Sequence, residues 1–75
     1  SILSGVVDLF FLEEDGIVLI DYKTDHILKE SINDRALYYK NQIELYKEAI
    51  QSSFDMIVKE SYIYFLSVGE KVKID

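Results

Sequence analysis

Seventy-five residues are enough for one small domain, and 14 acidic residues against 8 basic ones give it a formal charge of −6. This balance argues against strong electrostatic binding of nucleic acid by the chain alone, because free-standing nucleic-acid binders usually carry a basic face. The chain has no cysteine, which excludes disulfides and cysteine-ligated zinc and fits a reducing, cytoplasmic location. No apolar run approaches the roughly 20 residues that a membrane span needs, so no membrane partner is expected.

The first part of the chain predicts a β-hairpin. Residues 5–12 are apolar and β-prone, residues 17–23 form a second such run, and an Asp15-Gly16 pair between two runs of this kind is a strong hairpin signal. With the tip at Asp15-Gly16, the numbers of paired positions would sum to about 30 or 31. Asp8 would then lie opposite Tyr22 or Lys23, and a shift of one residue decides which face of the sheet it takes.

The middle of the chain predicts a loop over residues 24–33 and then a helix. Asp34 is the expected N-cap, with Ser31 or Asn33 as alternatives. The helix is expected from Arg35 to about Gln51 and to end at Ser52-Ser53. Its apolar stripe is expected to consist of Leu37, Ile43, Tyr46 and Ile50, with Tyr39, Gln42 and Ala49 close to it.

A third strand over residues 61–68, a turn at Gly69-Glu70 and a short fourth strand over residues 71–74 complete the pattern. The order β-β-α-β-β predicts an α/β fold in which one main helix packs on a mixed β-sheet. We expect residues 1–75 to form a single domain that is a fragment of a longer protein.

The residues expected to carry chemistry lie where the second strand ends. Side chains alternate along a strand, so Asp21 and Lys23 share one face and Tyr22 points to the other. In the favourable hairpin register, Asp8 joins them at the end of the sheet. Two carboxylates can hold Mg²⁺ or Mn²⁺, and a nearby lysine can orient a water, transfer a proton or stabilise developing charge, which suits phosphodiester hydrolysis.

The alternative interpretation is a non-catalytic α/β interaction module. An Asp-x-Lys on a strand is often a surface ion pair worth about 0–1 kcal/mol. In that case the apolar strands would form a surface for a partner, and the isolated chain would self-associate. Divalent metal distinguishes the two hypotheses, because an ion-pair surface has no need of it.

Three short blocks carry a resemblance to a known family. They are Gly5-x-x-Asp8, Asp21-Tyr22-Lys23 and Gln42-x-x-x-Tyr46, and they occur in that order. The chain thereby resembles the nuclease domain of the RecB family within the PD-(D/E)xK superfamily, and most closely the C-terminal nuclease domain of the AddA-type helicase–nucleases. The resemblance covers nearly the whole chain and implies a restriction-endonuclease-like core.

The resemblance also implies roles for individual residues. Asp8 and Asp21 would be metal ligands together with the backbone carbonyl of Tyr22, and Lys23 would be the catalytic lysine. Gln42 and Tyr46, one helical turn apart on the same face, would support the active site or the DNA. For Tyr46, packing in the core is an equally good interpretation.

The wider function implied by the resemblance is exonucleolytic cleavage of DNA in an AddAB/RecBCD-type complex for double-strand break repair and recombination. The partners would be DNA, the helicase portion of the parent chain and an AddB-like subunit. The absence of cysteine excludes an iron–sulfur cluster within this chain and favours the AddA-like branch. Whether this chain is active by itself is left open.

Overall fold

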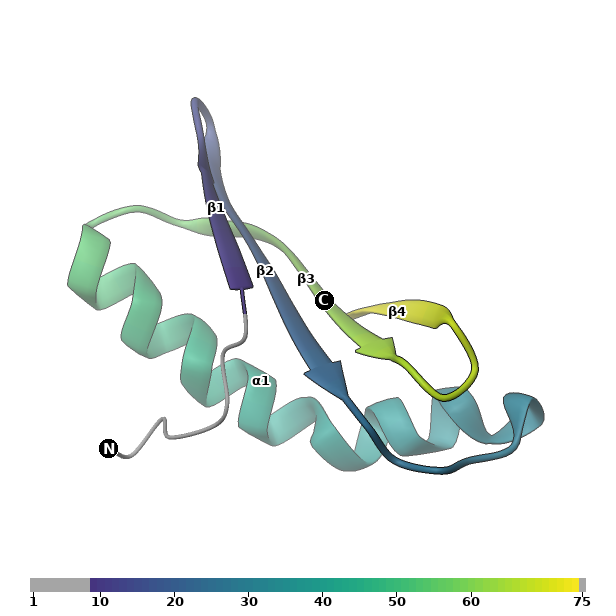
Figure 1. The fold of residues 1–75 in the computed structure, drawn as a ribbon. Coiled ribbons are helices and arrows are strands. Elements are labelled where there is room, and N and C mark those ends of the chain that lie inside the picture. The colour runs from purple at the N-terminus through teal and green to yellow at the C-terminus, as the bar shows by residue number, and fades with distance from the viewer. Residues whose placement is uncertain (1–8, 75) are drawn as a thin grey trace.

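The computed structural model describes residues 9–74, with four strands and one long helix (Figure 1). The strands are β1 (Leu9–Glu13), β2 (Gly16–Lys23), β3 (Val58–Phe65) and β4 (Glu70–Ile74). The helix is α1 (Ile32–Phe54), and a 3-10 turn over Lys29–Ser31 leads into it.

The four strands form one mixed sheet in the order β1-β2-β3-β4. The pairs β1–β2 and β3–β4 are antiparallel, whereas β2 and β3 are parallel. Parallel neighbours need a crossover connection, and α1 supplies it along one face of the sheet, as Figure 1 shows. The predicted α/β fold, with a restriction-endonuclease-like mixed sheet and one main helix, is therefore confirmed.

The hairpin register differs from the prediction. The turn is formed by residues 14 and 15, Glu13 pairs with Gly16, and Leu9 pairs with Ile20. The expected tip at Asp15-Gly16 was therefore wrong by one residue, and so was the register derived from it. The predicted position of Asp8 lies outside the described residues.

Gly16 is needed for the strand and not only for the turn. Its φ is +149°, and a Cβ atom there would lie 3.1 Å from the carbonyl oxygen of Ile57. That oxygen already accepts a 2.8 Å hydrogen bond from the backbone N–H of Ile17. Glycine is thus required by the close approach of the chain that leads into β3, a contact that the local sequence does not reveal.

The helix is longer than predicted at both ends. It begins at Ile32, with Ser31 in the N-cap position, and it passes through Ser52-Ser53 to end at Phe54. Serine is only mildly unfavourable in a helix, so the pair does not stop it. The helix ends instead where Asp55 adopts a left-handed conformation with φ of 51°.

One position of the predicted apolar stripe was wrong. Leu37 is 68% exposed, and its neighbour Ala36 is buried in its stead. The predictions for Ile43, Tyr46 and Ile50 are confirmed, since all three are buried against the sheet. A helix face is set by the sheet that it meets, and that contact favoured the smaller side chain.

Strand β3 lies earlier in the chain than predicted. It starts at Val58 and ends at Phe65, and residues 66–69 then form the turn before β4 begins at Glu70. Pairing with β2 determines these limits, because Val58 pairs with Ile17 and Phe65 with Lys23. The apolar residues beyond Phe65 belong to the turn.

The hydrophobic core lies between α1 and the sheet. Its fully buried members are Ile17, Leu19, Ile43, Ile63 and Phe65. Because Ile17 and Leu19 alternate along β2, the next position on the same face is residue 21, which directs the polar end of this strand towards the helix. Across residues 9–74, no helix is long and apolar enough to cross a membrane.

Candidate active site at the end of strand β2

The core-facing side of β2 ends in a carboxylate and an ammonium group. Asp21 is fully buried, and the side chain of Lys23 is 14% exposed. The Lys23 Nζ atom lies 3.3 Å from the Asp21 Oδ2 atom. A carboxylate held in the core beside an ammonium is costly to desolvate, which marks this strand end as more than a solvated surface pair.

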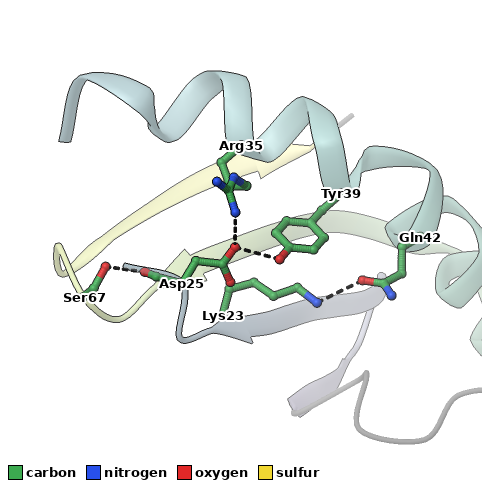
Figure 2. A network of polar contacts seen from close by, with 6 residues as sticks. All are labelled: Lys23, Asp25, Arg35, Tyr39, Gln42 and Ser67. Carbon is green, nitrogen blue, oxygen red and sulfur yellow. Dashed lines mark hydrogen bonds and ion pairs between the residues drawn. The ribbon is translucent and has the colours of Figure 1, made fainter. Parts of the chain in front are cut away.

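The ammonium of Lys23 is also held by the helix (Figure 2). It donates a 2.9 Å hydrogen bond to Gln42 Oε1 and lies 4.2 Å from the centre of the Tyr39 ring. The backbone carbonyl of Lys23 accepts a 3.0 Å hydrogen bond from the N–H of Leu66 in the turn after β3. Strand, helix and turn therefore each contact this one residue.

A second polar group adjoins the first. Asp25 Oδ2 accepts hydrogen bonds from Arg35 at 2.6 Å and from the hydroxyl of Tyr39 at 2.7 Å (Figure 2). The Ser67 hydroxyl donates a 2.6 Å hydrogen bond to the Asp25 backbone carbonyl. Tyr39 thus belongs to both groups, since its ring faces Lys23 and its hydroxyl bonds Asp25.

The electrostatics of this second group keep Asp25 charged. The hydrogen bond from Tyr39 lowers the pKa of Asp25, and the hydrogen bond and charge of Arg35 lower it further. Burial raises the pKa of Tyr39, and its bond to Asp25 raises it too. At neutral pH the carboxylate therefore accepts and the phenol donates.

The structure brings together only some of the predicted site residues. Asp21, Lys23 and Gln42 meet at the end of β2, whereas Tyr46 is buried in the core one helical turn from Gln42. Asp8 lies outside the described residues. The Tyr22 ring stands on the other face of the sheet, 5.7 Å from that of Tyr64, and its carbonyl as a ligand stays a prediction.

Sequence reasoning missed Asp25, Arg35 and Tyr39 as parts of the site. Two signals point to them. Asp25 continues the alternation of Asp21 and Lys23 by two further residues, and Arg35, Tyr39 and Gln42 are spaced by four and three residues, as on one helix face. The two signals become informative once the strand end and the helix face are known to meet.

The donor chemistry of the site suits a hard divalent cation. Asp21 offers carboxylate oxygens, the ligand type that Mg²⁺ prefers, and Lys23 beside it offers no competing soft donor. Within residues 9–74, no three histidine, cysteine, aspartate or glutamate side chains gather into a metal-binding group. A cation at Asp21 would accordingly need further oxygen donors, for which Asp8 is the predicted source.

Comparison with protein families accounts for this arrangement. A model described as the PD-(D/E)XK nuclease superfamily matches residues 2–73. The chain belongs to this superfamily. The PD-(D/E)XK match includes Asp21 and Lys23 at the end of β2 and the helix that carries Gln42, so the resemblance inferred from three short motifs is confirmed.

Individual relatives agree with the PD-(D/E)XK assignment. The chain is 45% identical over 74 residues to an ATP-dependent helicase/nuclease subunit of the AddA type from Clostridium acetobutylicum, covering 99% of this chain and 6% of that protein. It is 37% identical over 73 residues to the protein of the same name from Carboxydothermus hydrogenoformans, covering 97% and 6%. For the Thermoanaerobacter sp. protein the identity is 46% over 67 residues, covering 89% and 5%. The chain thus spans about one-twentieth of the length of these relatives.

Proposed function

We propose that this chain is the catalytic core of a divalent-metal-dependent deoxyribonuclease. The observation that carries the proposal is the pairing of buried Asp21 with Lys23 at 3.3 Å, at a strand end, in a chain of the PD-(D/E)XK nuclease superfamily. The reaction joins a water oxygen to phosphorus and breaks the bond from phosphorus to the leaving sugar oxygen, which then takes up a proton.

Each residue of the group has a distinct role in the proposal. Asp21 and Asp8 hold Mg²⁺ or Mn²⁺ with the Tyr22 carbonyl, and such a cation supplies positive charge that acidifies the attacking water and offsets charge on the phosphate. The Lys23 ammonium donates hydrogen bonds to the oxygen on which negative charge develops. Gln42 directs the ammonium by accepting one of its hydrogens.

Tyr46 supports the site from behind. It lies on the same helix face as Gln42, one turn on, and packs in the core beneath the sheet. That packing limits rotation and sliding of the helix, so the Gln42 amide stays within reach of Lys23. The proposed contribution of Tyr46 is therefore to helix position and not to contact with DNA.

The proposed biological setting follows from the relatives. Those described above are named as ATP-dependent helicase/nuclease subunits. We infer that the parent protein cuts DNA as an exonuclease within an AddAB-type complex in double-strand break repair. In this setting the helicase portion of the same chain delivers the strand, and an AddB-like subunit is the partner.

The interaction-module alternative required a surface ion pair. Asp21 is fully buried instead, and Lys23 is nearly so. Replacing a buried ion pair by apolar side chains is often neutral or stabilising, so stability alone is a weak reason to keep one. This burial favours the nuclease over the module.

The first test is Mn²⁺ binding to the intact protein by calorimetry, with circular dichroism to verify folding. We expect Asp21→Asn and Asp8→Asn each to lower the affinity at least tenfold, because each removes a charged oxygen ligand. Asp34→Asn, at an exposed position in the first turn of α1, is the matched control and should bind as the unaltered protein does.

Cleavage of a linear DNA duplex by the same variants completes the test. Metal-dependent cleavage that Asp21→Asn and Lys23→Ala abolish supports the nuclease. Equal Mn²⁺ affinity in all the folded proteins, with cleavage unaffected by either change, would instead return the ion-pair module to first place.

A further inference from the structure

Tyr39 is the residue that joins the two polar groups at the end of β2. Its ring centre lies 4.2 Å from Lys23 Nζ, and its hydroxyl is 2.7 Å from Asp25 Oδ2 (Figure 2). The ring lies on α1, whereas both partners follow one another at the end of the strand. Neither contact is part of the Gln42-x-x-x-Tyr46 motif.

The ring contact constrains a side chain that is otherwise flexible. A lysine has a flexible four-carbon stem, and its ammonium is a point charge without a preferred plane. The face of an aromatic ring attracts such a cation within about 6 Å of its centre. With Gln42 Oε1 at 2.9 Å and Asp21 Oδ2 at 3.3 Å, the ring is a third contact that locates the ammonium.

The hydroxyl contact fixes the ring in turn. Asp25 accepts from Tyr39 and also from Arg35, one turn earlier on the same helix, at 2.6 Å. The Asp25 backbone is itself held by the Ser67 hydroxyl at 2.6 Å. A ring anchored at its hydroxyl cannot swing away from Lys23 without breaking a hydrogen bond to a charged acceptor.

We propose that Tyr39 is a positioning residue that orients the ammonium of Lys23 for the reaction, with Asp25 and Arg35 holding its ring in place. This inference rests on the proposed nuclease function. It assigns Tyr39 no contact with DNA or metal, so its effect is exerted through Lys23 alone.

The test measures kcat and KM of the intact protein on a DNA duplex for Tyr39→Leu, Tyr39→Phe and Lys23→Ala, and for the Tyr39→Leu/Lys23→Ala double variant. Leucine removes the ring, whereas phenylalanine keeps it and loses only the hydroxyl. Tyr38→Leu is the matched control, because the neighbouring tyrosine on the same helix is 74% exposed.

We expect Tyr39→Leu to lower kcat about tenfold with KM and Mn²⁺ affinity unchanged, since misorientation affects the chemical step. Tyr39→Phe should restore kcat to within about threefold of the original value, because a phenyl ring still attracts the cation. In the Lys23→Ala background, Tyr39→Leu should cause no further loss, as expected for two residues that act as a unit.

Two outcomes overturn the proposal alone. One is a full kcat in Tyr39→Leu while Lys23→Ala is impaired, and the other is an equal, additive loss from Tyr39→Leu in both backgrounds. If circular dichroism shows that Tyr39→Leu is unfolded, the same comparison with Tyr39→Phe decides, since that change leaves the ring volume intact. Full cleavage by Lys23→Ala would be different, because it overturns the proposed function and the role of Tyr39 with it.

Discussion

At the scale of single residues, Asp25 shows how a site can depend on a side chain that performs no chemistry. It lies just beyond the catalytic strand end and accepts hydrogen bonds from two side chains of α1, Arg35 and Tyr39. Such bonds to a charged acceptor are among the stronger polar contacts in proteins. Asp25 therefore ties the strand end to the helix that carries Gln42.

The bonds to Asp25 make the stability of the fold depend on pH. The hydrogen bond from Tyr39, together with Arg35, lowers the pKa of Asp25 in the folded state. A lowered folded pKa means that the unfolded chain binds the proton more tightly. The stabilisation is thus complete above the unfolded pKa of about 3.9 and is lost as the pH falls through the folded value.

We predict that Asp25→Asn lowers stability at neutral pH and weakens its dependence on pH below about pH 5. Asparagine keeps the shape of the side chain and has no proton to gain in acid. Urea unfolding at pH 7 and at pH 3, compared with the exposed control Asp34→Asn, measures both effects. An unaltered pH dependence in Asp25→Asn would mean that the bonds to Arg35 and Tyr39 do not stabilise the folded chain.

At the scale of elements, the end of α1 determines where β3 can begin. The N–H of Asp55 bonds the carbonyl of Gln51, and the Gln51 side chain accepts a 2.7 Å hydrogen bond from the backbone N–H of Val58. Val58 is the first residue of β3 and pairs with Ile17. The left-handed turn at Asp55 thereby sets the register of the parallel pair.

Asp55 is not the residue best suited to that turn. Its φ of 51° is disfavoured for residues with a Cβ atom, and a carboxylate at a helix C-terminus opposes the helix dipole. We predict that Asp55→Gly raises the free energy of unfolding by about 0.5–1 kcal/mol, the usual advantage of glycine at this position.

Asp55→Asn separates the two causes, because asparagine removes the charge and keeps the Cβ atom. Thermal unfolding followed by circular dichroism should rank the proteins as Asp55→Gly above Asp55→Asn above the unaltered chain. A lower melting temperature for Asp55→Gly would show that the carboxylate contributes a contact more valuable than relief of the backbone.

At the scale of the whole molecule, the described residues form two layers, with α1 against one face of the sheet (Figure 1). The other face carries Ile20, Tyr22, Tyr62 and Tyr64, each only partly buried. Contiguous apolar and aromatic surface of this kind usually marks a site of contact with other protein. In the parent protein, further parts of the chain are proposed to cover it.

We predict that the 75-residue chain, prepared by itself, self-associates through this sheet face. Light scattering should show a mean mass that rises with concentration. Tyr62→Glu should suppress the rise, because a carboxylate on this face would have to be desolvated on association. Leu45→Glu, on the exposed outer face of α1, is the matched control. A constant monomer mass at high concentration would contradict the prediction.

The sequence by itself determined the order of the elements and the centre of the site. Alternation along a strand and periodicity along a helix are local properties, so they put Asp21 and Lys23 on one face and Ile43, Tyr46 and Ile50 on another. Gln42 could be singled out because an amide beside an apolar stripe is unusual, and the contact with Lys23 bears this out.

Only the tertiary structure decided the hairpin register, the ends of α1 and the polar group around Asp25. Each depends on segments far apart in the chain, such as the approach of Ile57 to Gly16 and the bond of Ser67 to Asp25. Local preferences differ by too little to choose between neighbouring registers or helix ends, whereas packing of the sheet against the helix allows one. Tyr39 acquired its proposed role in this way, because its ring meets Lys23 only when the strand end lies beneath the helix.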